Sequence, residues 1–354
     1  MSNLNKAWKR WKEIIIITLV LKVVLLFISL IANPNTLNVL YLWVRWDSQQ
    51  YIIIAKNGYQ TIGEQAFTIV FYPLYPLLIK LISFLTNDFQ ISAVLISLFF
   101  SFATSIILFE LTLLDFDRRV ALLSVWFINI FPTAYFLQAA YTESLFLTTS
   151  LATIYFFRKG LFVRSGLIGG AASMTRVNGI LLLPILFMEA KTFGKNLITM
   201  LLTPIGFLVY LLINKLTFGE PLYFSKILSS HWYKHFTWPW ISIRNLISFY
   251  QTQTGNYYWL FLAELITIFL LIIVTIFVYL RVRKSYGIYM FFNLLMFSST
   301  GFIMSTPRYA LILFPIFIAL GLIKNKLSVT LISISFLILL FLLTYLYTQG
   351  RWAF

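Results

Sequence analysis

Long apolar runs separated by short basic segments are the feature that most constrains this chain. Several runs reach the length of about 20 residues that a helix needs to cross the hydrocarbon core of a membrane. Hydrophobic residues make up 60% of the sequence and charged residues only 11%, and the mean hydropathy is +0.88. A water-soluble globular protein does not have this composition. The sequence therefore predicts an all-α polytopic membrane protein.

About eleven apolar runs predict as many transmembrane helices in one membrane domain, residues 1–354. The predicted helices cover residues 14–32, 91–114, 120–137, 144–157, 165–175, 177–189, 196–213, 258–280, 286–304, 308–323 and 327–347. The shortness of 165–175 and 177–189 indicates a broken pair that meets at residues 175–179. The first run is long enough to remain in the membrane, so we expect an anchor rather than a cleavable signal peptide.

The net charge of +16 indicates topology rather than a nucleic-acid partner. The Lys and Arg residues fall in short clusters between apolar runs, which is typical of cytoplasmic loops. If the N-terminus is cytoplasmic, more than half of the 27 Lys and Arg residues lie in inner segments. We expect membrane lipids as partners, and no nucleic acid.

Residues 67–86 decide the sidedness of everything after them. Counting them as a span would place the later basic clusters outside, and Pro73, Pro76 and Lys80 interrupt the run. We therefore predict a pair of short amphipathic helices in the outer interface. The unusual polar residues then gather on the outer face. The expected location is the plasma membrane in a prokaryote or the endoplasmic reticulum membrane in a eukaryote, with the site on the outer or luminal face.

The first outer loop carries Trp46-Asp47-Ser48 directly after the first apolar run. A carboxylate at a membrane boundary is costly unless it has a function, so Asp47 is a candidate catalytic residue. The alternative is structural, because Asp47 with Gln50 matches a capping box at the start of a helix over about 48–56 that would end at Gly58. Asp47 as base and Asp47 as helix cap both remain open at this point.

Glu143 is a second acidic candidate on the outer face. It follows Thr142 at a predicted helix start, where an acid also suits the helix dipole. Together Asp47 and Glu143 could hold a divalent cation, but the outer loops contain no Asp-x-Asp motif, so we predict no metal site and no certain cofactor. Asp115 and Asp117 have that spacing, yet they lie beside Arg118 and are interpreted as a solvated inner turn.

His231 and His235 lie four residues apart in an aromatic loop that includes Trp232, Trp238 and Trp240. Two such histidines can begin a zinc site, but no third ligand has the usual spacing. The composition of the loop favours a membrane-interface belt, and the loop could also close over a lipid-borne acceptor.

Several short motifs occur in an order that resembles a known family. They are Trp46-Asp47-Ser48 with Tyr51, Ala55 and Gly58-Tyr59, the run Phe71–Pro76, Tyr141–Phe146, Thr175–Gly179 and Pro307-Arg308-Tyr309. This pattern resembles the PIG-V family within the GT-C superfamily of polyprenyl-phosphate-sugar-dependent glycosyltransferases, from about residue 40 to 320. Gln50 stands where the family's Trp-Asp-Ser motif is expected to continue with His.

The resemblance implies a GT-C-type mannosyltransferase that uses a polyprenyl (dolichyl-type) phosphate-mannose donor. The acceptor would be a glycolipid, glycan or protein on the non-cytoplasmic side, and the anomeric carbon would be inverted. The leaving phosphate ester is already a stable anion, so the reaction needs mainly a base for the acceptor hydroxyl. Asp47 and Glu143 are the expected catalytic residues. The expected substrate-binding residues are Trp46, Ser48, Tyr51, Tyr59, Arg176, Asn178, Arg308 and Tyr309.

Two alternatives stay open. Arg176 and Arg308 suit a phosphate through forked charge-assisted contacts, but Arg308 could instead extend to the outer interface as an anchor. The whole protein could be a transporter or flippase for a lipid-linked sugar. That reading is less favoured, because no inverted repeat is visible and Glu110, Glu189 and Glu264 lie near predicted helix ends.

Overall fold

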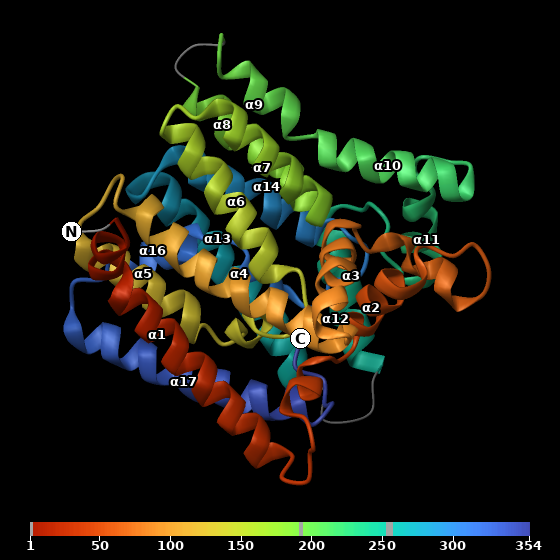
Figure 1. Cartoon of the computed structure of the whole chain (residues 1–354), viewed down its shortest axis with the longest axis horizontal. Helices are drawn as coiled ribbons and strands as arrows, with labels where there is room; N and C mark the ends of the chain where they lie inside the picture. The colour runs from red at the N-terminus through yellow and green to blue at the C-terminus, as the bar shows by residue number, and fades with distance from the viewer. Residues whose placement is uncertain (1–2, 191–193, 253–257) are drawn as a thin grey trace.

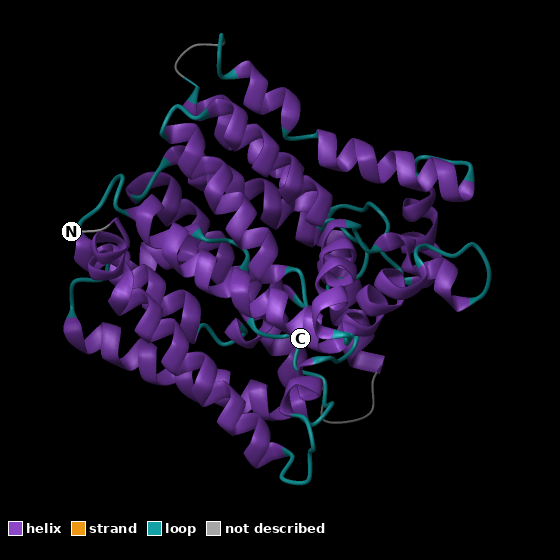
Figure 2. Cartoon of the chain, in the orientation of Figure 1, coloured by secondary structure: helices purple, strands orange, loops and turns teal. Residues whose placement is uncertain are grey.

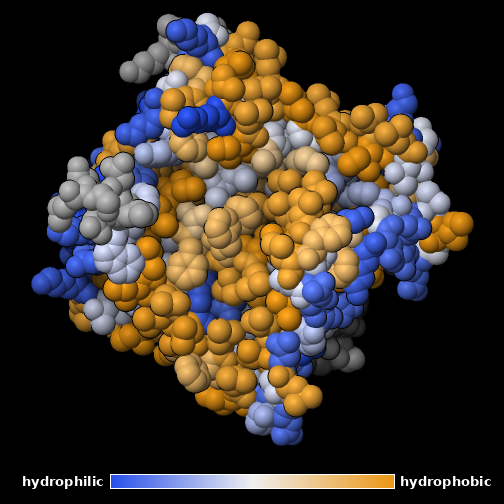
Figure 3. All heavy atoms as spheres, viewed as in Figure 1, coloured by the Kyte–Doolittle hydropathy of each residue, from blue (hydrophilic) through white to orange (hydrophobic). Residues whose placement is uncertain are grey.

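The computed structural model describes residues 3–190, 194–252 and 258–354. Over these residues the secondary structure is helical and contains no strand (Figure 2). Apolar side chains cover most of the face seen in Figure 3, whereas hydrophilic side chains gather mainly toward its edges. This distribution fits a protein whose surrounding solvent is largely lipid.

Within the described residues, five helical segments are long and apolar enough to cross a membrane, judged by length and composition, and a bent pair over residues 64–86 would make a sixth if it is one span. The five lie in α1 (Asn3–Ala32), α4 (Phe89–Thr112), the pair α9 (Leu197–Leu202) and α10 (Ile205–Phe218), α13 (Tyr258–Arg281) and α17 (Lys326–Thr348). Each remaining predicted run also contains helix, in shorter pieces. These are α5 (Arg118–Ile130), α6 (Glu143–Arg158), α7 (Phe162–Thr175), α8 (Leu183–Glu189), α14 (Lys284–Ser298), α15 (Thr306–Leu311) and α16 (Pro315–Gly321). The all-α class is confirmed, and the count of eleven crossings stays a prediction.

Both predicted breaks are present. Residues 67–86 fall in two helices, η2 (Glu64–Val70) and α3 (Leu74–Thr86), which are bent by 111°. Their place in the outer interface remains a prediction. The second break lies at Arg176, whose extended backbone (φ −156°, ψ 151°) separates α7 from η4 (Val177–Leu182). Gly179 lets η4 fold back on α7, because a Cβ there would come within 2.3 Å of the Ser173 backbone nitrogen.

The core is centred on α6, which packs between α4 and α7 and is buried along most of its length. Figure 1 shows α1 and α17 together along one side and α9 and α10 along the opposite side. Four helices gather at one end of the bundle, namely α2 (Asp47–Asn57), α3, α11 (Tyr223–His231) and α12 (Pro239–Thr252). The first turn of α6 therefore opens toward that end.

The opposite end of α6 is held by ion pairs. Both Arg158 terminal nitrogens donate to Asp115 at 2.6 Å, and Arg283 donates to Asp115 at 2.9 Å and to Glu189 at 2.5 and 2.6 Å. Residues 113–116 form a turn in which Asp115 is exposed, as predicted, and its ion pairs join α6 to the start of α14. Asp117 caps α5 by accepting from the Val120 N–H.

Candidate active site

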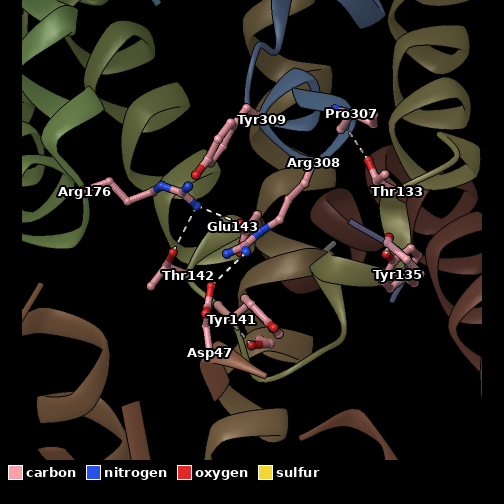
Figure 4. A network of polar contacts seen from close by, with 12 residues as sticks. Asp47, Thr133, Tyr135, Tyr141, Thr142, Glu143, Arg176, Pro307, Arg308 and Tyr309 are labelled. Atoms are coloured by element: carbon pink, nitrogen blue, oxygen red, sulfur yellow. Dashed lines mark hydrogen bonds and ion pairs between the residues drawn. The ribbon is translucent and has the colours of Figure 1, made fainter. Parts of the chain in front are cut away.

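A buried carboxylate, Glu143, lies at the centre of the site at the first residue of α6 (Figure 4). Its Oε1 accepts from Arg308 Nε at 2.6 Å and from Arg176 Nη1 at 2.7 Å. Arg308 Nη1 donates to Asp47 Oδ2 at 3.1 Å, and Arg176 Nη1 donates to Thr142 Oγ1 at 3.1 Å. We call Asp47, Glu143, Arg176 and Arg308 the ion-pair network. Its members come from four separate segments, and all four were predicted as site residues.

Two aromatic rings lie against the Arg308 guanidinium. The guanidinium carbon lies 4.3 Å from the Tyr141 ring centroid and 4.8 Å from that of Phe136, a cation–π arrangement. The residue is only 7% exposed. The interpretation of Arg308 as an interface anchor is therefore wrong, because its charge turns inward to two carboxylates.

The position of Arg308 depends on Glu264, which sequence reasoning did not connect to the site. Glu264 is buried in α13, and its two oxygens accept from the backbone N–H groups of Ser305 at 2.6 Å and Thr306 at 2.8 Å. These are free amides at the start of α15, which a carboxylate satisfies well. Ser305 adopts a left-handed backbone (φ 69°) there. Glu264 thus anchors the helix that carries Arg308.

Asp47 begins α2 without capping it. Trp46 occupies the cap position with φ 53° and ψ −122°, and its side chain makes no cap hydrogen bond. The capping interpretation of Asp47 is wrong, because the carboxylate turns to Arg308 instead. Its side chain is 31% exposed, so it is the accessible acid of the network. The predicted end of this helix is confirmed, since Gly58 follows it with φ 70°.

The other predicted site residues mostly pack around the network. Tyr51 is buried edge-on against Phe71 and Tyr75, Tyr59 donates to the Phe71 carbonyl at 2.6 Å, and Asn178 donates to Asn293 at 2.7 Å. Ser48 accepts from the Arg45 N–H at 3.3 Å, and Trp46 is 41% exposed and contacts Trp352. Substrate contacts by these five residues stay predictions.

Tyr309 and a residue that sequence reasoning missed, Lys234, border the network. The Tyr309 ring stacks on Phe297 at 4.8 Å, and the Arg176 guanidinium carbon lies 5.7 Å from its centroid. Lys234 Nζ donates to the Tyr309 hydroxyl at 3.2 Å. Lys234 belongs to the aromatic loop after α11, and its only sequence signal was a basic residue among aromatic ones.

The residues present do not fit a metal ion. Among the described residues, no group of three His, Cys, Asp or Glu side chains could hold one. His231 lies against Phe67 with ring centroids 3.3 Å apart, whereas His235 lies against Gly301. Arg308 already bridges Asp47 and Glu143, so a cation between these carboxylates would have to displace a guanidinium.

A hollow of about 370 Å³ lies beside the site. Its lining combines polar and aromatic side chains, namely Gln50, Glu64, Phe67, Phe71, His231 and Trp232. Gln50 follows Asp47 by three residues on α2, so the two side chains share one helix face. The hollow and the accessible carboxylate are therefore neighbours.

The fold resembles that of a solved structure. ArnT from Cupriavidus metallidurans, in a crystal structure bound to undecaprenyl phosphate, superposes with a TM-score of 0.55 and 13% sequence identity. The match covers 90% of this chain and 62% of ArnT. This likeness confirms the predicted GT-C-type fold.

Two curated relatives are similar to part of the chain. GPI mannosyltransferase 2 of Schizosaccharomyces pombe is 27% identical over 157 residues, which cover 43% of this chain and 33% of the relative. GPI alpha-1,6-mannosyltransferase 2 of Mus musculus is 29% identical over 147 residues, covering 38% and 29%. The aligned part thus spans about a third of each relative's length.

The family comparison covers more of the chain than either relative. The family described as Mannosyltransferase (PIG-V) matches residues 17–238, well over half of the sequence. This range includes Asp47, Glu143 and Arg176. The chain is a member of the PIG-V mannosyltransferase family.

Proposed function

We propose that this protein is a single-domain membrane mannosyltransferase. It transfers mannose from a polyprenyl (dolichyl-type) phosphate donor to a glycolipid, glycan or protein acceptor. The observation that carries the proposal is the ion-pair network. In it Arg308 contacts both an accessible carboxylate, Asp47, and a buried one, Glu143. Membership of the PIG-V family supports the choice of mannose.

In the proposed reaction Asp47 is the base. The acceptor hydroxyl oxygen bonds to C1 of mannose while the bond from C1 to the phosphate oxygen breaks. The hydroxyl proton passes to the Asp47 carboxylate, and the phosphate monoester leaves with the bonding electron pair. One displacement of this kind inverts C1. The leaving phosphate needs no proton, so a single carboxylate suffices.

Arg308 is the proposed link between base and donor. Its Nε and Nη1 are used by Glu143 and Asp47, which fixes the plane of the guanidinium beside the reacting groups. A planar fork can hold two oxygens at once, whereas an ammonium cannot. Arg308 would thereby couple donor binding to the orientation of Asp47.

Arg308→Lys is expected to weaken use of the donor while the chain still folds. Lysine keeps the charge, but it cannot reach both carboxylates and a phosphate in one plane. The loss should be about 1–3 kcal/mol, the range of a charge-assisted hydrogen bond, measured from kcat/KM for the donor. An unchanged dependence of rate on donor concentration would contradict a donor role for Arg308.

The hollow beside Asp47 is the proposed entry for the acceptor sugar. Polar Gln50, Glu64 and His231 can exchange hydrogen bonds with hydroxyl groups, and the rings of Phe71 and Trp232 offer apolar faces. Concave sites of this mixed lining are usual for small ligands. The acceptor hydroxyl would then reach the carboxylate one helical turn away.

The site is proposed to face the outside or the lumen. The chain contains no cysteine, so single cysteines can report sidedness. Gln60→Cys and Phe236→Cys, both at exposed positions near the site, should react with an impermeant thiol reagent added to intact cells. Lys324→Cys, exposed at the other end, should react only after the membrane is opened. Labelling of Lys324→Cys in intact cells would reverse the topology.

The activity itself is tested by incubating the purified protein with labelled polyprenyl-phosphate mannose and a cell lipid extract. A labelled product that requires both components supports the transferase. Movement of the intact donor across a vesicle membrane, without a product, would favour the alternative of a flippase.

A further inference from the structure

The four side chains of the ion-pair network carry no net charge. Its two carboxylates, Asp47 and Glu143, match its two guanidiniums, Arg176 and Arg308, through contacts of 2.6–3.1 Å. An anionic donor phosphate therefore meets no net positive charge from these four side chains. A further cation is needed if the site is to attract a phosphate strongly.

Lys234 is that cation. Its Nζ donates to the Tyr309 hydroxyl at 3.2 Å and lies 5.4 Å from the Tyr309 ring centroid. Within the described part of the chain, no acidic group forms an ion pair with it. Glu264 lies close enough to feel its charge, but both Glu264 oxygens are engaged by backbone amides. The Lys234 ammonium, which has three N–H donors and uses one for Tyr309, thus keeps donors for a ligand.

The loop that carries Lys234 is held in a costly conformation. Tyr233, directly before it, has a left-handed backbone (φ 53°), which is unfavourable for a residue other than glycine. The Lys234 N–H donates to the Leu228 carbonyl at 2.9 Å, and the Thr237 N–H donates to Ser299 at 3.2 Å. Strain of this kind tends to persist where it positions a functional group. Here it places the ammonium over Tyr309.

Arg176 supplies a second donor edge around Tyr309. Only its Nη1 is engaged by Thr142 and Glu143, and its Nε and Nη2 have no partner among the described residues. In Figure 4 the Tyr309 hydroxyl points toward the Arg176 guanidinium. Lys234 and Arg176 therefore both lie against Tyr309, and with its hydroxyl they present donors of three chemical kinds.

We infer that Lys234, the Tyr309 hydroxyl and Arg176 form a phosphate subsite. Resting on the proposed function, the subsite takes the phosphate of the polyprenyl-phosphate donor. Lys234 supplies the charge that the network lacks, and Arg176 orients the phosphate oxygens. The aromatic loop thus carries donor-binding chemistry.

The subsite is tested by binding rather than by turnover. Undecaprenyl phosphate is titrated into the purified protein in detergent, with undecaprenol and inorganic phosphate as separate probes. Lys234→Gln should raise the Kd for undecaprenyl phosphate by about tenfold or more, the effect of losing one hydrogen bond to a charged group. It should leave undecaprenol binding unchanged, and Lys234→Arg should retain most of the affinity.

Lys226→Gln is the matched control. Lys226 lies on α11 in the same outer region, but it is exposed and pairs with Glu220 at 2.5 Å. Its replacement should leave the Kd unchanged. Equal affinity of wild type and Lys234→Gln for undecaprenyl phosphate, with undecaprenol bound more weakly, would overturn the subsite alone. Equal binding of undecaprenyl phosphate and undecaprenol by the wild type would instead overturn the proposed donor. If inorganic phosphate binds with a Kd comparable to that of undecaprenyl phosphate, the subsite recognises free phosphate rather than a phosphate carried by a lipid.

Discussion

Asp47→Asn is expected to lower mannosyl transfer by a factor of about 10²–10⁴, the usual contribution of a positioned base, while the fold survives. The amide oxygen can still accept from Arg308 Nη1, so the contact that orients this side chain is kept. Asparagine cannot take the proton of the acceptor hydroxyl. The substitution therefore separates the basicity of Asp47 from its place in the network.

The matched control is Asp88→Asn. Asp88 is a true helix cap, because its Oδ1 accepts from the N–H groups of Gln90 at 2.7 Å and Ile91 at 2.9 Å. Asparagine caps about as well as aspartate, so this variant should keep near-normal stability and transfer. Transfer rate and thermal stability are measured on the same preparation. Retention of more than about a tenth of the activity by Asp47→Asn would exclude Asp47 as the base.

The sequence predicts the helical segments well because a helix that crosses a membrane needs a long, continuous run of apolar residues, and such a run is visible in the local sequence. An apolar run of sufficient length reports a helix whatever its neighbours are. Even the breaks at residues 67–86 and at Arg176 carried local signals, namely two prolines in one and short runs on both sides of the other.

The sequence predicted which residues form the site, but not which of them contact one another. Asp47, Glu143, Arg176 and Arg308 stood out because ionisable residues are costly at a membrane boundary. The sequence has no means of showing that Arg308 bonds to Glu143, since 165 positions separate them. The local capping pattern at Asp47 was misleading for the same reason, because a tertiary ion pair outcompeted a local hydrogen bond.

Glu264 and Lys234 show which kinds of role cannot be predicted from the sequence. Glu264 acts through backbone amides of a distant helix, and amides carry no side-chain signal. Lys234 resembles any interface lysine until Tyr309 is placed beside it. In both cases the function follows from a contact that only the folded chain creates.

Glu143→Gln is expected to have the largest effect on stability, about 3–5 kcal/mol, the cost of breaking a buried ion pair. Glu143 is fully buried, and its Oε1 alone accepts from both arginines. A neutral amide would leave the buried Arg308 and the largely buried Arg176 with Asp47 as the remaining carboxylate of the network. Transfer should fall as well, because Arg308 would no longer be fixed beside Asp47.

A double-mutant cycle in detergent distinguishes this account from a simple packing effect. Arg176→Met added to Glu143→Gln removes one of the stranded charges, so the double variant should unfold at a smaller cost than the sum of the two single variants. Glu220→Gln, in an exposed pair with Lys226, should cost less than about 1 kcal/mol. Strict additivity of Glu143→Gln and Arg176→Met would mean that the two charges do not neutralise each other.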